Sequence, residues 1–260
     1  VSVPSLPLPM VGGALSIFLA FRNNSAYDRW WEARTLWGAL VNRSRSFARQ
    51  TLTLVDADGD PSADPVCREL VQLQSLYVHV LRCHLRRQNP FPELQSALPA
   101  DTVAWLRTQR NVPIAILLRI GQILRGLYNA KRLDSFRLLA FDDSLSDLCN
   151  IQGGCERIKN TPLPRQYEFF PRVLVSIYCI LLPIGLVSGM GLITPVASTL
   201  ISFIFISLEF IGRDLEDPFE VTVHDTPLSS LSRMIDNNLR QSVGVTDLAP
   251  EVRPIDGFVY

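Results

Sequence analysis

Two stretches without charged side chains dominate the hydrophobic pattern of the chain. The longer one, Val173–Leu208, holds 36 residues. A helix that spans a membrane needs about 20 apolar residues, so this stretch predicts two short spans joined by a turn. We place the spans near residues 169–187 and 192–210, because the sequence Ser-Gly-Met-Gly at 188–191 interrupts a helix.

The other charge-free stretch, Val1–Phe21, opens the sequence. Its prolines disfavour regular helix in the first third, whereas the pattern from Met10 onward suits a helix that spans the membrane. A signal peptide is the alternative, but the stretch has neither a basic start nor a small-residue cleavage site. We therefore predict a membrane span here as well.

Basic residues cluster at one end of each predicted span. Six arginines lie within residues 22–49, Lys159 and Arg172 precede the second span, and Arg213 follows the third. By the positive-inside rule these ends face the cytoplasm. The first span then starts outside the cell, so we expect one further span upstream of Val1 that this sequence lacks.

Between the membrane spans the sequence is polar but keeps helical periodicity. Apolar residues recur at helical spacing over residues 26–54, which predicts that the first helix continues into water. Asp101, and either Asp134 or Ser135, suit the N-cap positions of later helices. No useful length of chain alternates like a β-strand, so we predict an all-α membrane protein. Further helices are predicted at 65–87, 114–131, 133–158 and 228–241.

Composition narrows the range of functions. Only 19% of the residues are charged, below the roughly 25% of ordinary soluble domains. The 25 basic and 25 acidic residues cancel, which argues against a nucleic-acid partner. The five cysteines and three histidines show no metal-binding or redox spacing, and the sequence has no phosphate loop or nucleophile motif. We therefore expect no catalytic site.

Three motifs occur in the order in which one family of membrane proteins has them. They are Phe21–Glu32, which contains Arg-Trp-Trp at 29–31, then Gly154–Pro164, and then Asp214–Phe219. Together they resemble the bacterial bestrophins over most of the chain. The resemblance implies a bestrophin-like helical subunit with transmembrane helices and a large cytosolic helical region. It also implies a homopentamer around one central pore, multi-pass in a bacterial inner membrane.

The hydrophobic pattern and the resemblance together divide the chain into four segments. Residues 1–21 form the transmembrane neck helix that lines the pore, and residues 22–168 form the cytosolic helical region. Residues 169–211 form two transmembrane helices. Residues 212–260 form a cytosolic C-terminal segment.

Gly13, Ile17 and Phe21, here called the neck stripe, match the narrow neck that the family builds in its pore. They recur every fourth residue, so they share one face of a helix. The family usually has larger apolar residues at the first position, so Gly13 implies a wider outer end. The alternative is an apolar stripe that faces lipid or another helix. A ring of apolar side chains offers an ion no ligands and gates by dewetting.

Leu163 matches a second constriction of the family, at the cytosolic exit of the pore. Pro162 and Pro164 flank it and keep the backbone out of a helix. The alternative is a turn before the membrane span with an ordinary buried leucine. The resemblance favours the aperture.

Four polar residues follow the neck stripe. The resemblance implies that they face a cytosolic cavity or join subunits, and the alternative is the solvated face of an amphipathic helix. They are Arg22, Asn23, Asn24 and Arg29.

Asp214, Asp217 and Asp225 lie in the region where animal bestrophins bind calcium. Calcium prefers several oxygen ligands, but this chain has far fewer acids after Pro218-Phe219 than the animal proteins. Salt bridges and helix capping are therefore favoured over a calcium site, and calcium is not expected as a cofactor.

The predicted function is a channel for monovalent ions. The partners implied are other copies of the chain, the lipid bilayer and the permeating ions Na⁺, K⁺ or Cl⁻, with no nucleic acid. Because the motifs look bacterial, monovalent cations are favoured over anions. A chloride channel of the same family is the alternative, and a membrane-anchored interaction protein without a pore is less favoured.

Overall fold

The chain folds into α-helices joined by short links. The computed structural model describes residues 7–57, 59–222, 224–250 and 252, and all regular structure within these ranges is helical. Two compact units form. One, called the membrane unit, contains Val1–Glu32 and Asn160–Pro218, and the other, called the bundle unit, contains Ala33–Lys159 and Phe219–Tyr260.

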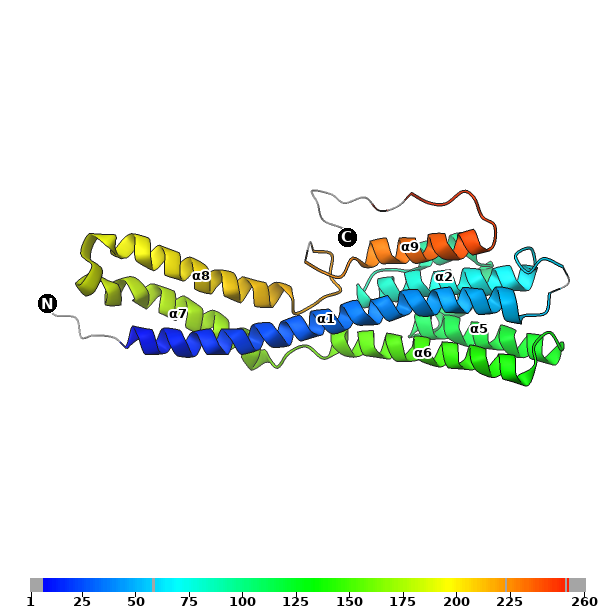
Figure 1. The fold of residues 1–260 in the computed structure, drawn as a ribbon, viewed down its shortest axis with the longest axis horizontal. Helices are drawn as coiled ribbons and strands as arrows, with labels where there is room; N and C mark the ends of the chain where they lie inside the picture. Colours follow the sequence, from blue (N-terminus) through cyan, green and yellow to red (C-terminus); the bar gives the residue numbers. More distant parts are fainter. Residues whose placement is uncertain (1–6, 58, 223, 251, 253–260) are drawn as a thin grey trace. The chain divides into compact units, whose positions relative to one another are not determined.

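Helix α1, Leu8–Leu54, is one continuous helix of 47 residues (Figure 1). The prediction that the first span continues as one helix is therefore confirmed. After Pro9 no proline interrupts the run, so nothing removes a backbone hydrogen bond. The predicted neck segment starts at residue 1, and residues 1–6 lie outside the described part of the chain.

The membrane unit is built on a helical hairpin that packs against the first part of α1. Helices α7, Arg165–Met190, and α8, Thr194–Asp214, lie side by side (Figure 1). The turn η1, Gly191–Ile193, joins them, and Gly191 has the positive φ of 52° that glycine adopts without strain. The two predicted helices are present, and the turn between them begins at Gly191, the last residue of the predicted turn at 188–191. That the two helices cross a membrane stays a prediction.

Little of the hairpin is buried within the chain. Its stretch Phe169–Asp214 is long and apolar enough to cross a membrane, and only 17% of its most apolar window is buried. The small core between α1, α7 and α8 includes a ring pair, Tyr178 and Phe205, with centroids 4.9 Å apart. Most apolar side chains of this unit therefore need lipid or other chains around them.

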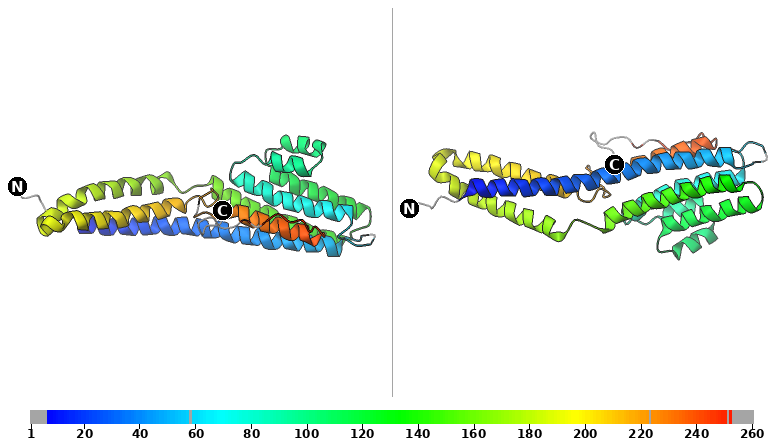
Figure 2. Two further views of the ribbon diagram at one scale, coloured as in Figure 1. Left: turned by 90° about the horizontal axis from the view of Figure 1, so that it is seen from above. Right: turned by 60° about the horizontal axis from the view of Figure 1, so that its bottom comes forward.

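The bundle unit has a larger core of its own. Buried apolar side chains from α1, α2, α5, α6 and α9 form one cluster, in which the rings of Phe47 and Phe141 pack edge to face at 5.6 Å. Helix α2 packs against α5 and α9, and Figure 2 shows the short helices α3 and α4 beside the longer ones. The helices are α2 (Pro65–Leu85), α3 (Phe91–Ala97), α4 (Ala100–Arg107), α5 (Val112–Asn129), α6 (Ser135–Asn160) and α9 (Leu228–Ser242).

Helix ends test the capping predictions. Asp134 caps α6, because its Oδ1 accepts from the N–H groups of Phe136 and Arg137, each at 2.9 Å. The prediction for Asp101 was wrong, because α4 begins at Ala100 and Asp101 lies inside its first turn. Helix α3 was not predicted, because Pro90 and Pro92 flank its first residue; proline is compatible with a first turn.

The boundaries of the two compact units differ from those of the four predicted segments. The unit boundaries follow residues 32, 159 and 218, whereas the predicted segments end at residues 21, 168 and 211. The prediction used the ends of apolar stretches. The membrane unit also includes polar residues of α1 up to Glu32 and the links that pack against them. Each boundary between units therefore lies in polar sequence rather than at the end of an apolar stretch.

Candidate ion pathway

The neck stripe lies on an exposed face of α1. Ile17 is 60% exposed and Phe21 is 65% exposed, and an added Cβ at Gly13 would meet no atom within 4 Å. The opposite face is buried, with Leu15 and Leu19 packed against the α7–α8 hairpin. Nothing within the described chain therefore covers the face that the neck stripe occupies.

The same face carries polar residues beyond the neck stripe. Asn24 and Asp28, three and seven residues after Phe21, are both exposed. These spacings keep a side chain on one face of a helix. Asp28 was missed by the sequence reasoning, which ended the stripe at its last apolar residue; extending the same period would have found it.

Arg22 does not lie on the exposed face. Its side chain is completely buried, and its Nη1 lies 3.3 Å from the carbonyl oxygen of Glu209 and 3.5 Å from the Glu209 carboxylate. Its Nη2 lies 3.8 Å from the carboxylate of Glu216. The expectation that Arg22 faces a cavity or another subunit is therefore not met, because a buried guanidinium needs carboxylate partners and finds them inside the chain.

Two more of the predicted polar residues hold parts of the membrane unit together. Asn23 donates from Nδ2 to the carbonyl of Leu208 at 2.9 Å. Arg29 donates to the carbonyls of Glu216, at 3.2 Å, and Thr161, at 2.7 Å. These bonds join α1 to the end of α8 and to the link before α7.

Leu163 lies in the short link between α6 and α7. Residues 161–164 are not helical, and α7 begins directly after Pro164, whose ψ of 136° is extended. Leu163 is partly buried. The link is thus short and restrained by two prolines, as an aperture requires, and the aperture itself stays a prediction.

The three candidate calcium ligands do not all belong to one unit. Asp214 and Asp217 lie in the membrane unit, and Asp225 lies in the bundle unit, where its carboxylate accepts from the N–H of Thr222 at 2.7 Å. Among the described residues, no three His, Cys, Asp or Glu side chains gather as a metal site. The sequence favoured salt bridges and helix capping over a calcium site here, and that preference stays untested.

These features define a class: an all-α membrane protein whose first helix leaves an apolar stripe uncovered. The chain belongs to the bestrophin family. A family model described as "Bacterial/Fungal Bestrophin protein" matches residues 1–241. The resemblance noted from the three sequence motifs is therefore confirmed, and so is the helical bestrophin fold.

Relatives and solved structures agree with this assignment. The chain is 39% identical over 251 residues to the "Voltage-dependent anion channel-forming protein RSc3414" of Ralstonia nicotianae, covering 96% of this chain and 81% of the relative. It is 34% identical to YneE of Escherichia coli, which carries the same description, over 95% and 80% of the two chains. A bestrophin homologue from Klebsiella pneumoniae superposes with a TM-score of 0.89 at 31% identity, covering 94% and 89%.

Proposed function

We propose that the chain is the pore-forming subunit of a homopentameric ion channel in a bacterial inner membrane. Membership of the bestrophin family supports an ion channel. The observation that carries the pore assignment is the uncovered neck stripe, which is apolar and faces away from the α7–α8 hairpin. In the proposed assembly, five copies of α1 turn this face toward the central axis.

The neck stripe forms the tightest part of the proposed pore. Rings of Ile17 and Phe21 give a passing ion no oxygen or nitrogen ligand, so the ion keeps its water shell or loses part of it at a penalty. Such a ring controls conduction by its width and wetting. Gly13 leaves the outer end of the neck wider, and Leu163 forms a second narrow point at the cytosolic end.

We propose that monovalent cations pass in preference to anions. Asp28 supports this choice, because five copies of this exposed carboxylate beyond the neck would form an acidic ring, which favours cations. The two arginines nearest to Asp28 in the sequence bond to other groups. Arg22 is buried against Glu209, and Arg29 donates to two backbone carbonyls. The alternative is an anion channel, which the descriptions of the relatives from Ralstonia and Escherichia coli favour.

Conductance of the purified protein in planar bilayers tests the pore assignment. Ile17→Ala should raise the single-channel conductance at least about twofold, because a shorter side chain widens the ring and reduces ion dehydration. Val11→Ala is the matched control, since Val11 is an exposed apolar residue of α1 outside the neck stripe. Equal conductance in both variants and the wild type would contradict Ile17 as a constriction.

Two further measurements address the assembly and the ion. Light scattering on the purified protein should give five copies per particle, and a monomer or dimer would contradict the proposed assembly. The reversal potential in asymmetric KCl should lie on the side of the potassium equilibrium potential. A value on the chloride side would replace the cation proposal with the anion alternative and leave the pore itself intact.

A further inference from the structure

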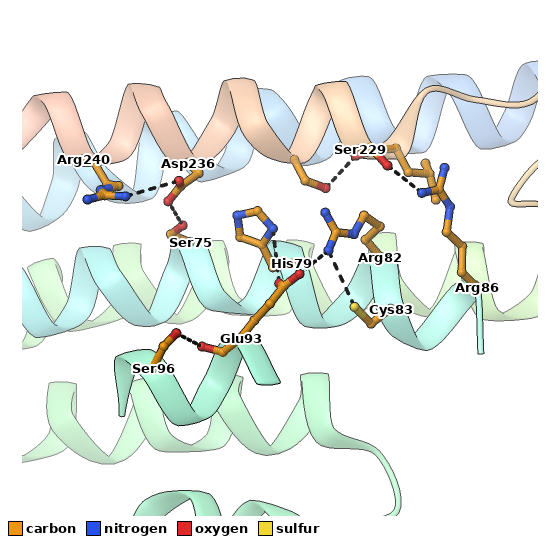
Figure 3. Close-up of polar contacts among 12 residues, drawn as sticks. Ser75, His79, Arg82, Cys83, Arg86, Glu93, Ser96, Ser229, Asp236 and Arg240 are labelled. Atoms are coloured by element: carbon orange, nitrogen blue, oxygen red, sulfur yellow. Dashed lines mark hydrogen bonds and ion pairs between the residues drawn. The ribbon is translucent and has the colours of Figure 1, made fainter. Parts of the chain in front are cut away.

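A polar face of α2 crosses the otherwise apolar bundle unit. Ser75, His79, Arg82 and Arg86 recur at intervals of three or four residues, so they share one side of the helix. Figure 3 shows these side chains on the side of α2 that faces α9. A polar face between two packed helices needs partners along its whole length.

Hydrogen bonds between α2 and α9 close both ends of this face. Ser75 donates to the carboxylate of Asp236 at 2.5 Å, and Arg86 donates to the hydroxyl of Ser229 at 2.6 Å (Figure 3). The middle is different. There His79 and Arg82 reach Glu93 of α3, at 3.6 Å and 2.6 Å, rather than a residue of α9.

A groove of about 790 Å³ opens along this face. Its walls come from α2, α3, α9 and the link that follows α9. Four arginines line it against only two carboxylates, so the groove carries a surplus of two positive charges with His79 neutral. The charged residues are Arg68, Arg82, Arg233 and Arg240, with Glu93 and Asp236.

Three of the four arginines have partners within the described chain. Arg68 donates to the carbonyl of Ser62 at 2.7 Å and interacts electrostatically with Asp60. Arg82 is paired with Glu93, and Arg240 lies 3.8 Å from the carboxylate of Asp236. Arg233 makes no hydrogen bond or ion pair with any residue that the structure describes. Its guanidinium therefore remains available to an anion, which it can hold through two parallel hydrogen bonds.

His79 adds hydrogen-bonding capacity at the centre of the groove. Burial lowers the pKa of His79 below its ordinary value, and this effect outweighs the opposite influence of Glu93, so the ring is neutral at neutral pH. Its Nδ1 is buried and makes no hydrogen bond among the described residues, because the carboxylate of Glu93, at 3.6 Å, lies beyond hydrogen-bond distance. A buried ring nitrogen without a partner is unfavourable, and a bound ligand would supply the partner.

We propose that this groove binds a small organic dianion: two carboxylate groups, or one doubly charged phosphate, on a short aliphatic body. The positive surplus matches two negative charges, and the volume lies in the range of about 300–1,000 Å³ typical of small-molecule sites. The apolar part of the wall is aliphatic, and no Phe, Tyr or Trp is among the described residues that line the groove. The aliphatic residues are Val71, Leu76, Ala97, Val243 and Val245.

Calorimetry on the intact purified protein tests this proposal, and it requires no channel activity. The probes are succinate and glycerol 3-phosphate, which distinguish carboxylate from phosphate recognition, with 1,4-butanediol as the uncharged control. At least one dianion should bind saturably, and butanediol should give no heat. Arg233→Gln should weaken this binding about tenfold or more, because it removes a charge-assisted contact.

Matched variants separate a specific site from general charge effects. Arg125→Gln removes the same charge from an exposed arginine outside the groove and should leave the affinity unchanged. Arg68→Gln provides a second groove variant should Arg233→Gln fail to fold. No saturable heat with either dianion at millimolar concentrations, or equal weakening by Arg125→Gln and the groove variants, would overturn the proposal. A change of particle mass in Arg233→Gln without a change of affinity would do the same, since it would assign the groove to contacts between copies.

Discussion

The two units of the chain use apolar residues in opposite ways. In the bundle unit they form a closed core, in which the buried hydroxyl of Tyr77 donates to the carbonyl of Leu148 at 3.1 Å. In the membrane unit large apolar side chains point outward; Leu192 is completely exposed and Phe203 is 66% exposed. The bundle unit can therefore be stabilised by its own burial, whereas the exposed apolar side chains of the membrane unit need an apolar environment such as lipid.

Truncating a bundle core residue should give the largest effect. Phe141→Ala should lower the free energy of unfolding by about 3–5 kcal/mol, because it removes a completely buried ring and leaves a cavity against Phe47. Loss of helical circular dichroism with denaturant, measured in detergent, gives this value. Phe136→Ala is the control on the same helix, since Phe136 is 88% exposed. Equal effects of the two changes would mean that the bundle core does not carry the stability of this unit.

Breaking the buried charge pair should give the next largest effect, in the membrane unit. Arg22→Met should lower stability by about 3 kcal/mol, because it removes the closer and fully buried of the two guanidinium groups beside Glu209 and leaves only Arg172, at 3.9 Å. The loss is measured as the fraction of protein that remains in the native particle after stepwise heating in detergent. Arg34→Met, at an exposed arginine of α1, should have little effect.

A double variant sharpens the same test. Arg22→Met combined with Glu209→Gln should be more stable than Arg22→Met alone, because the double variant no longer buries a carboxylate that has lost its closer guanidinium partner. If Arg22→Met behaves like Arg34→Met, the pair contributes nothing, and the membrane unit is held by its apolar contacts alone.

Much of this contrast could be predicted from the sequence. The charge-free stretch predicted both helices of the hairpin. The glycine-rich sequence at 188–191 placed the turn slightly too early, because α7 continues to Met190 and the turn is Gly191–Ile193. Arg22 was misplaced because its partner Glu209 lies 187 residues away in the sequence, and local spacing carries no information about such contacts. The groove was missed for the same reason, since its charged residues come from α2, α3 and α9, which meet only in the folded chain.

A smaller effect, on ion selectivity, is expected from removing the charge of Asp28 on the exposed face of α1. If the proposed acidic ring attracts cations, Asp28→Asn should lower the cation-to-anion permeability ratio by at least roughly fivefold, since the five carboxylates together contribute at least the roughly 1 kcal/mol of a single one near a hydrated ion. The reversal potential in asymmetric KCl measures the ratio. Asp143→Asn removes an exposed charge from α6 in the bundle unit and should leave the ratio unchanged. An identical ratio in wild type and Asp28→Asn would remove the support for cations and favour the anion alternative.

The smallest effect concerns a charge at the edge of the bundle unit. Asp64 caps α2 by accepting from the N–H groups of Val66 and Cys67, at 2.9 and 3.1 Å, and pairs with Arg132 at 2.6 Å. Burial alone would raise the pKa of Asp64, but the hydrogen bonds from Cys67, Arg132 and Val66 outweigh it, so its pKa is lowered on folding. Ionised Asp64 therefore stabilises the fold above its pKa in the unfolded chain, and this contribution disappears as the pH falls through the lower, folded pKa.

Asp64→Asn isolates this charge, because the amide oxygen can still cap α2 while the pair with Arg132 is lost. The variant should be less stable than the wild type by about 0.5 kcal/mol at neutral pH, as expected for a partly exposed pair. The difference should vanish at pH values below the folded pKa, where wild-type Asp64 is protonated too. Unfolding curves recorded across this pH range, with Asp143→Asn as the control for a general loss of charge, provide the measurement. A difference that persists unchanged into acid would show that shape rather than charge makes Asp64 stabilising, and that the edge of the bundle unit, like its core, depends on packing.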